Sequence, residues 1–389
     1  MKKRFFLHTL ALAAMCATAA TGAIAQEKFK IGLVLPLTGQ FGPTGKQVES
    51  AVRLYMAQHG DTIGGKKVEL ILKDDASTPD LSRRLAQELV VNDKVNVLAG
   101  FVLTPSALAA APVATQARTP LVAMASATSI VTETSPFIVR TSFTVPQAAV
   151  SIADWAPRNG IKKVVTLVSD YGPGIDAEKF FVSRFKFNGG QIIETLRVPM
   201  RNPDFAPFLQ RVRDAKPDAL FVFVPGGTGA ALMKQFAERG MDKAGIKVIG
   251  TGDITDDNDL NTMGDATIGV VTAHHYSASH NSAMNKKFVD AFQKATNGLR
   301  PNFHAVGGYD GMRVIYEAAR VSKGGSGEAL LNAMKGQIFE SPRGPIFIDA
   351  QTRDVVQNIY IRRVEKVGGQ LYNQEFDTIR DVKDPGKTK

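Results

Sequence analysis

Short runs of apolar, mostly β-branched residues alternate with helical patterns along most of the chain. The predicted strands are residues 29–35, 68–72, 95–99, 121–124, 137–140, 164–168, 191–198, 219–224, 247–249 and 269–271. Helical spacing of apolar residues predicts helices over 46–59, 80–92, 105–117, 175–187, 205–214 and 229–239. This alternation predicts an α/β fold, in which helices cover both faces of parallel sheets.

The chain is longer than one doubly wound sheet usually accommodates, so we expect two domains. A break is expected near residues 142–147, because Pro146 precedes a new helix that carries Trp155 and the strand–helix alternation restarts beyond it. No low-complexity linker separates the two halves. We therefore expect two lobes joined by close crossovers.

The N-terminus has the pattern of a secretory signal peptide. A cationic start over residues 2–4 is followed by an apolar run over residues 5–20 and by the small residues Ala23 and Ala25. We predict cleavage after Ala25, so residues 1–25 form the signal peptide. The apolar run is too short to be a convincing membrane anchor.

Cysteine and charge narrow the possible functions. Cys16, the only cysteine, lies in the signal peptide behind Met15, where a lipoprotein signal needs a small residue. The mature chain would therefore have no cysteine, which excludes cysteine catalysis and zinc–thiolate sites. Its charge falls from +10 to +7 when the three basic residues of the signal are removed. The Lys and Arg residues of the mature chain are scattered along the sequence. This argues against nucleic-acid binding and favours a general attraction for anions.

The clearest candidate site is the junction between the strand that ends near Phe101 and the following helix. Thr104 is expected to be the N-cap and Pro105 the first helical residue. The free amides of this helix start, with the hydroxyls of Thr104 and Ser106, suit a carboxylate. Ordinary helix capping would give the same pattern.

Two further junctions lie in the second half. Tyr171 precedes a Gly/Pro turn over residues 172–174 and could contact the flat body of a ligand, although a lone turn tyrosine carries little information. Residues 224–229, which include Thr228, are rich in glycine and allow the backbone to approach a bound molecule.

Motifs for cofactors, metals and hydrolysis are missing. Residues 39–46 end like a P-loop, but Gln40 replaces its first glycine and Gln47 its Ser or Thr. His274 and His275 are adjacent instead of spaced for a metal, and neither H-E-x-x-H nor G-x-S-x-G occurs. We expect no cofactor, no metal and no enzymatic activity.

Several segments together resemble the leucine/isoleucine/valine-binding family of periplasmic receptors. They are residues 30–39 (KIGLVLPLTG), Phe41-Gly42, Asp74-Asp75, Ala99-Gly100, Tyr171-Gly172 and Gly308-Tyr309-Asp310. The likeness covers nearly the whole mature chain. Residues 139–144 and 201–207 also resemble the subgroup that handles lignin-derived aromatic acids.

The resemblance implies two doubly wound parallel-sheet lobes, the type I periplasmic binding fold, joined by crossovers near Phe143, Ala273 and Pro345. It implies a monomer that works in the periplasm as the substrate-binding component of an ABC importer and passes a small carboxylate to an inner-membrane permease. A sensor that presents its ligand to a membrane receptor would use the same pocket. The implied division is 26–143 with 274–345 for lobe 1, and 144–273 with 346–389 for lobe 2.

The resemblance also implies ligand-contacting positions. Phe41 and Tyr171 match aromatic residues from opposite lobes, and Thr104 matches the hydroxyl residue that holds the ligand carboxylate. The remaining positions fall on a second polar segment and on other loops of the cleft. The full candidate set is Phe41, Phe101, Thr104, Ser106, Ser126, Thr128, Tyr171, Thr228, Asp253 and Tyr276.

One departure bears on the ligand. Amino-acid binders of the family place a carboxylate against the ligand's ammonium group, and here the acid, Asp253, is displaced by about one position. Ser77 and Leu103 also occupy the places of a cystine that some members have. We therefore expect an aromatic acid such as a hydroxybenzoate or a cinnamate, with a branched-chain or other amino acid as the alternative.

Overall fold

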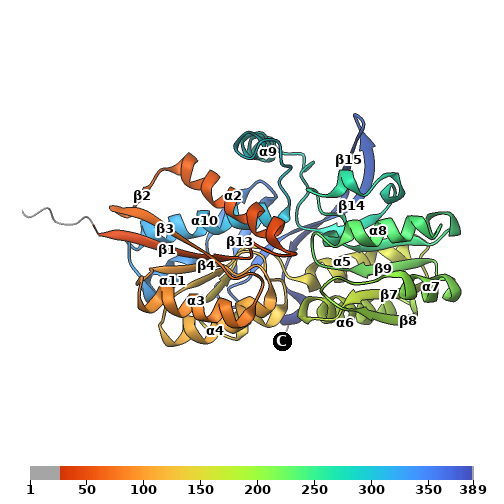
Figure 1. Cartoon of the computed structure of the whole chain (residues 1–389), viewed down its shortest axis with the longest axis horizontal. Helices are drawn as coiled ribbons and strands as arrows, with labels where there is room; N and C mark the ends of the chain where they lie inside the picture. The colour runs from red at the N-terminus through yellow and green to blue at the C-terminus, as the bar shows by residue number, and fades with distance from the viewer. Residues whose placement is uncertain (1–26, 388–389) are drawn as a thin grey trace, which may run out of the picture.

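The computed structural model describes residues 27–387, so the predicted signal peptide and Cys16 lie outside the described residues. The chain forms two α/β lobes that lie side by side (Figure 1). No helix within residues 27–387 is long and apolar enough to cross a membrane.

The first lobe is built on a six-stranded sheet in the order β2-β3-β1-β4-β5-β6. All neighbours are parallel except β2 and β3, which form a hairpin. Its strands are β1 (Lys28–Leu35), β2 (Thr62–Ile63), β3 (Lys66–Asp74), β4 (Val97–Gly100), β5 (Leu121–Ala123) and β6 (Ile138–Arg140). Its helical segments are α2 (Gly42–His59), α3 (Pro79–Val91), α4 (Thr104–Gln116), η1 (Ser129–Glu133), α10 (Phe303–Val321) and α11 (Gly327–Met334).

The second lobe is built on a nine-stranded sheet in which five parallel strands are extended by antiparallel ones. Its strands are β7 (Lys163–Ser169), β8 (Gln191–Val198), β9 (Ala219–Phe223), β10 (Lys247–Thr251), β11 (Val271–His274), β12 (Ile338–Ser341), β13 (Gly344–Ile348), β14 (Val355–Val367) and β15 (Gln370–Val382). The helices of this lobe are α5 (Val145–Arg158), α6 (Gly172–Phe187), α7 (Ala206–Ala215) and α8 (Gly229–Glu238), whereas α9 (Ala283–Ala295) packs against α2 of the first lobe. Short 3-10 turns are η2 (Asp242–Ala244), η3 (Gly252–Thr255), η4 (Leu260–Thr262), η5 (Asp265–Thr267) and η6 (Pro385–Lys387).

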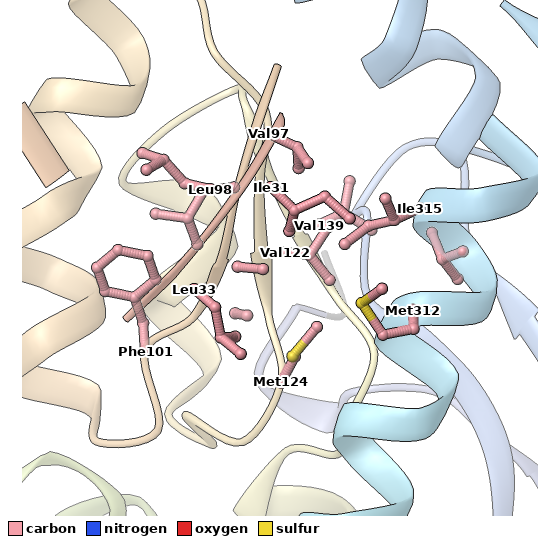
Figure 2. Close-up of a cluster of buried hydrophobic side chains, with 14 of the residues drawn as sticks. Ile31, Leu33, Val97, Leu98, Phe101, Val122, Met124, Val139, Met312 and Ile315 are labelled. Carbon is pink, nitrogen blue, oxygen red and sulfur yellow. The ribbon is translucent and has the colours of Figure 1, made fainter. Parts of the chain in front are cut away.

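The core of the first lobe explains why its central strands contain continuous apolar runs. Helices cover both faces of the sheet, so side chains of either parity are buried. Ile31 and Leu33 of β1 are fully buried, and Met312 and Ile315 of α10 pack against the sheet (Figure 2). The predicted α/β fold with parallel sheets is confirmed.

The antiparallel part of the second sheet was not predicted. Its strands β12 and β13 are hydrogen-bonded into this sheet, yet Phe339 and Ile346 pack into the core of the first lobe. The second sheet therefore begins at Ile338 on this segment, eight residues before the first residue of the expected lobe 2 segment at 346. The lobe boundaries given above remain a proposal.

Buried ion pairs join the segments that cross between the lobes. Arg140 Nε lies 2.8 Å from Asp354 Oδ1, and both side chains are buried. Arg343 Nε lies 2.9 Å from Asp310 Oδ2, and its Nη1 donates to the Ser142 carbonyl at 2.9 Å. Removing one partner of such a pair leaves an unpaired buried charge, so these contacts fix the crossovers in place.

Candidate functional site

A cavity lies between the two lobes and encloses about 410 Å³ of space, part of it open to solvent. The wall comes from strand ends and helix starts of both lobes, as expected for open α/β sheets. It consists of Phe41, Thr44, Val102, Leu103, Thr104, Ala125, Ala127, Phe143, Phe303 and His304 on one side and Tyr171, Pro173, Phe223, Pro225, Gly226 and Asp253 on the other.

The lobes are in contact around this cavity. Gln47 Nε2 of α2 donates to Asn258 Oδ1 at 3.0 Å, and Asn302 Nδ2 donates to both carboxylate oxygens of Asp256 at 3.0 and 2.9 Å. On another side, the Ser129 amide donates to Asp176 Oδ2 at 3.0 Å. These hydrogen bonds connect the two lobes directly, so the structure has a closed cleft.

Aromatic rings form much of the cavity wall. Phe143 and Phe303 meet edge to face with centroids 5.8 Å apart, and Tyr171 lies beside Phe223 with centroids 6.1 Å apart. Phe41 adds a ring from the start of α2. Such walls offer flat apolar surface, which suits a flat apolar ligand body.

Backbone amides supply the positive end of the site. Helices α2, α4 and α6 begin directly after the wall residues Phe41, Leu103 and Tyr171, and none of the three has a side-chain cap. The first N–H groups of α4 and α6 are therefore free for an anion, whereas the Gly42 amide of α2 donates to the Gly39 carbonyl at 3.1 Å. Within residues 27–387, no Lys or Arg lines the cavity, so a bound carboxylate would depend on these neutral donors.

The Thr104 hydroxyl lies at this positive end. Thr104 Oγ1 is 3.0 Å from Thr128 Oγ1, and a Cβ atom on Gly172 at the start of α6 would lie 3.0 Å from the same Thr128 oxygen. The N-termini of α4 and α6, which come from opposite lobes, thus converge on this pair of hydroxyls. The prediction that Thr104 is the N-cap is wrong: Leu103 has the extended cap conformation, and Thr104 is the first helical residue.

Asp253 brings a carboxylate to the cavity wall. It lies on η3, directly after β10, and is 5% exposed. Burial raises its pKa to about 6, although a 2.8 Å hydrogen bond from Thr251 Oγ1 to Oδ2 lowers it. Burial and the nearby Asp253 together raise the pKa of Tyr171 well above its usual value, so the phenol stays protonated.

His304 is a neutral polar group on the wall. Burial lowers its pKa to about 3. Its Nδ1 is buried without a hydrogen bond and lies 3.8 Å from Asp256 Oδ2. Burial and the neighbouring Asp259 raise the pKa of Asp256 to about 8, and Asp256 itself lies outside the cavity wall.

The adjacent histidines form part of the hinge. Phe143 stacks on His275 with centroids 4.6 Å apart, and His274 meets Phe303 edge to face at 4.5 Å. Burial lowers the pKa of both histidines well below the usual value. They act as neutral rings that pack two crossover segments together.

Four of the predicted site residues line the cavity: Phe41, Thr104, Tyr171 and Asp253. Asp253 does so although its sequence position is displaced, because the η3 turn follows β10 directly. An acid is therefore present at the wall, and the ammonium group of an amino-acid ligand would have a possible partner there. The displaced position of Asp253 in the sequence is thus no argument against an amino acid.

Three predicted residues of the first lobe lie beside the cavity without lining it. Phe101 has φ of +51° and packs its ring into the core behind the sheet (Figure 2). Ser106 donates to Asp75 at 3.0 Å. Ser126 is buried between Ala125 and Ala127, which provide the wall in its place.

The other three also lie off the wall. Thr128 reaches the site only through its contact with Thr104, and Thr228 is the buried N-cap residue of α8. Tyr276 is fully buried and donates to Asn285 Oδ1 at 3.1 Å.

Sequence reasoning missed most of the aromatic wall. Phe223 ends β9 two residues before Pro225, a signal of the same kind as the one that identified Tyr171. Phe303 and His304 follow Asn302, which caps α10 with hydrogen bonds to the amides of His304 and Ala305. The sequence shows that a helix can start here after a polar cap. No local pattern, however, predicts that this helix start lies beside Tyr171, about 130 residues away in the sequence.

Comparison with known proteins agrees with this geometry. The sequence profile of a family described as periplasmic binding protein matches residues 28–370. The chain belongs to this periplasmic binding protein family. It is also 40% identical over 389 residues to "Leu/Ile/Val-binding protein homolog 6" of Brucella melitensis, with 99% of each chain covered.

Solved structures of periplasmic binding proteins share the fold closely. A solute-binding protein of an ABC transporter from Rhodopseudomonas palustris BisB5, in complex with 3,4-dihydroxybenzoic acid, is 63% identical with a TM-score of 0.91. Another from Rhodopseudomonas palustris HaA2, in complex with p-hydroxybenzoic acid, is 39% identical with a TM-score of 0.90. Each match covers 93% of this chain and 99% of the other. The resemblance inferred from the sequence is confirmed.

Proposed function

We propose that this periplasmic binding protein is the substrate-binding component of an ABC importer and that it binds a small aromatic carboxylate between its lobes. The observation that carries the proposal is the cavity wall, where aromatic rings of both lobes flank uncapped helix N-termini. The rings suit a planar body and the free amides suit a carboxylate. The hydroxybenzoates bound by the two Rhodopseudomonas proteins support the same class of ligand.

Binding would proceed without a chemical reaction. Among the described wall residues, no hydroxyl is hydrogen-bonded to His304, so the cavity offers no activated nucleophile. Contacts from opposite lobes would stabilise the closed state, and the gain on ligand binding would drive the hinge. The protein would act as a monomer in the periplasm, with the inner-membrane permease as its partner.

A branched-chain or other amino acid is the second candidate. Asp253 favours it, because a carboxylate on the wall could pair with an ammonium group. The aromatic acid has stronger support, since the ring-lined wall exceeds what a short aliphatic side chain needs and the relative with bound 3,4-dihydroxybenzoic acid is 63% identical to this chain.

Isothermal titration calorimetry of the mature protein tests the proposal. We expect binding of 4-hydroxybenzoate, 3,4-dihydroxybenzoate or a hydroxycinnamate and weak or no binding of leucine. Ligand should be removed first by unfolding and refolding, so that a co-purified molecule does not mask the sites. Tight binding of leucine with no response to any aromatic acid would reverse the choice of ligand.

A further inference from the structure

We propose that Asp253 is a specificity-determining residue that selects aromatic acids carrying a ring hydroxyl over acids without one. The inference rests on the proposed function and adds to it a requirement at the end of the ligand remote from its carboxylate. The protein would bind phenolic acids selectively, and unsubstituted benzoate would be a poor ligand.

Asp253 is poorly satisfied by the protein alone. Among residues 27–387, the donors to its carboxylate are the Thr251 hydroxyl and the backbone amide of Asp253 itself, and no ion pair reaches it. Arg362 acts on it only through its charge, since the guanidinium donates to the Gly252 and Tyr276 carbonyls and to Thr272 Oγ1. A buried carboxylate with two donors can accept a further one, and the cavity is where one can come from.

Electrostatic repulsion fixes which end of the ligand meets Asp253. Two carboxylates in a site without Lys or Arg repel each other strongly at low dielectric. The ligand carboxylate therefore lies with the free amides at the start of α4 and α6, and the ligand body separates it from Asp253. The atom that reaches Asp253 belongs to the far part of the ring.

Only a donor is favourable at that position. An apolar substituent would cover the Asp253 carboxylate without pairing it, which costs more than leaving it hydrated. A phenolic hydroxyl donates one hydrogen bond to it and stays neutral at pH 7, since an ordinary phenol has a pKa of about 10. The neutral His304 adds no competing cation.

Gly252 explains why the acid is held in this orientation. A Cβ atom there would lie 2.1 Å from Arg362 Nη2 and 2.4 Å from His274 Cγ. The absence of a side chain lets the Arg362 guanidinium bind the Gly252 carbonyl, at 3.3 Å, directly before Asp253. The turn is fixed by neighbours that donate no hydrogen bond to the carboxylate itself.

The test compares ligands of the same shape with and without the donor. Dissociation constants are measured by calorimetry at pH 7.5 for 4-hydroxybenzoate against 4-methylbenzoate and for 3-hydroxybenzoate against 3-methylbenzoate. For the better hydroxy isomer we expect the wild-type protein to prefer the hydroxy compound by about 10- to 100-fold, the range for a hydrogen bond to a charged group. In Asp253→Asn the preference should fall below about fivefold.

Asp259→Asn is the matched control. It makes the same change on the same loop, and Asp259 does not line the cavity, so the ratio of dissociation constants should stay as in wild type. Equal affinity for hydroxy and methyl compounds in wild type, or an unchanged preference in Asp253→Asn, would overturn the inference while leaving the proposed function intact. Binding of none of these acids would overturn both.

Discussion

Gly226 provides a direct way to oppose closure of the lobes. It follows β9 on the second lobe, and its backbone conformation accepts other residues. A Cβ atom at this position would lie 2.8 Å from His304 Cε1 and 3.5 Å from Phe303 Cζ, both of which begin α10 on the first lobe, and 3.1 Å from Asp256 Oδ2 of its own lobe. The closest clash is with His304, so Gly226→Ala places a methyl group between the lobes and should act mainly on the closed state.

The size of the effect follows from the crowding. Carbon atoms pack at about 3.5 to 4.0 Å, so the methyl group is too close to His304 by at least about 0.7 Å. Accommodating an extra methyl in a packed site costs about 1 to 3 kcal/mol. Because the cost falls on the closed state, it should weaken ligand binding by about 5- to 150-fold.

Three measurements distinguish a clash in the closed state from a general loss of stability in Gly226→Ala. Calorimetry with 4-hydroxybenzoate should show the loss of affinity, the melting temperature of the ligand-free variant should match wild type, and small-angle scattering should show less compaction at the same ligand concentration. Gly325→Ala is the control, since its Cβ would lie 3.0 Å from the Ser322 carbonyl oxygen within one lobe. An affinity for Gly226→Ala within threefold of wild type would refute the role assigned to this contact.

Three further predictions follow from the wall and its surroundings. Thr104→Val should weaken carboxylate binding by about 1 to 3 kcal/mol, because a buried acceptor is left unpaired; unchanged affinity for every ligand in calorimetry would remove Thr104 from the site. Tyr171→Ala should weaken binding and spare the melting temperature of the empty protein, whereas a ring that only caps the core of its own lobe would give the opposite pair of results. Asp256 binds a proton more tightly when folded, with a pKa of about 8 against an ordinary 3.8, so its contribution to stability is lost as pH rises from about 4 through 8. Asp256→Asn should therefore show a smaller fall in melting temperature between pH 5 and pH 8.5 than wild type, and an equal fall would contradict the shift.

The parallel part of each sheet could be predicted because its pattern is local. Strands such as β4 and β9 are buried on both faces, and their sequences are uninterrupted apolar runs. The hairpin of β14 and β15 was missed because β15 is an edge strand that includes several charges and in which only Leu371 and Asn373 are buried. The two strands are adjacent in the sequence, and the Gly368-Gly369 pair that joins them is a two-residue hairpin signal that could have been recognised.

The candidate site was predicted in part for a similar reason. Thr104 and Tyr171 lie at strand-to-helix junctions with recognisable turn residues, and both line the cavity. Ser126 and Ala127 are neighbours on one irregular segment, and which of them faces the ligand depends on a rotation of the backbone that the sequence does not encode locally. Phe303 enters the site only because α10 packs beside α2, which is a property of the whole fold.

A crystal structure of the mature protein with a bound aromatic acid would show directly whether the acid binds between the lobes in the proposed orientation. We predict one molecule in the cavity between the lobes, with its carboxylate at the start of α4 beside Thr104, its ring between Phe41 and Tyr171, and a ring hydroxyl toward Asp253. A carboxylate bound elsewhere, or an amino acid whose ammonium group occupies the place beside Asp253, would contradict the account.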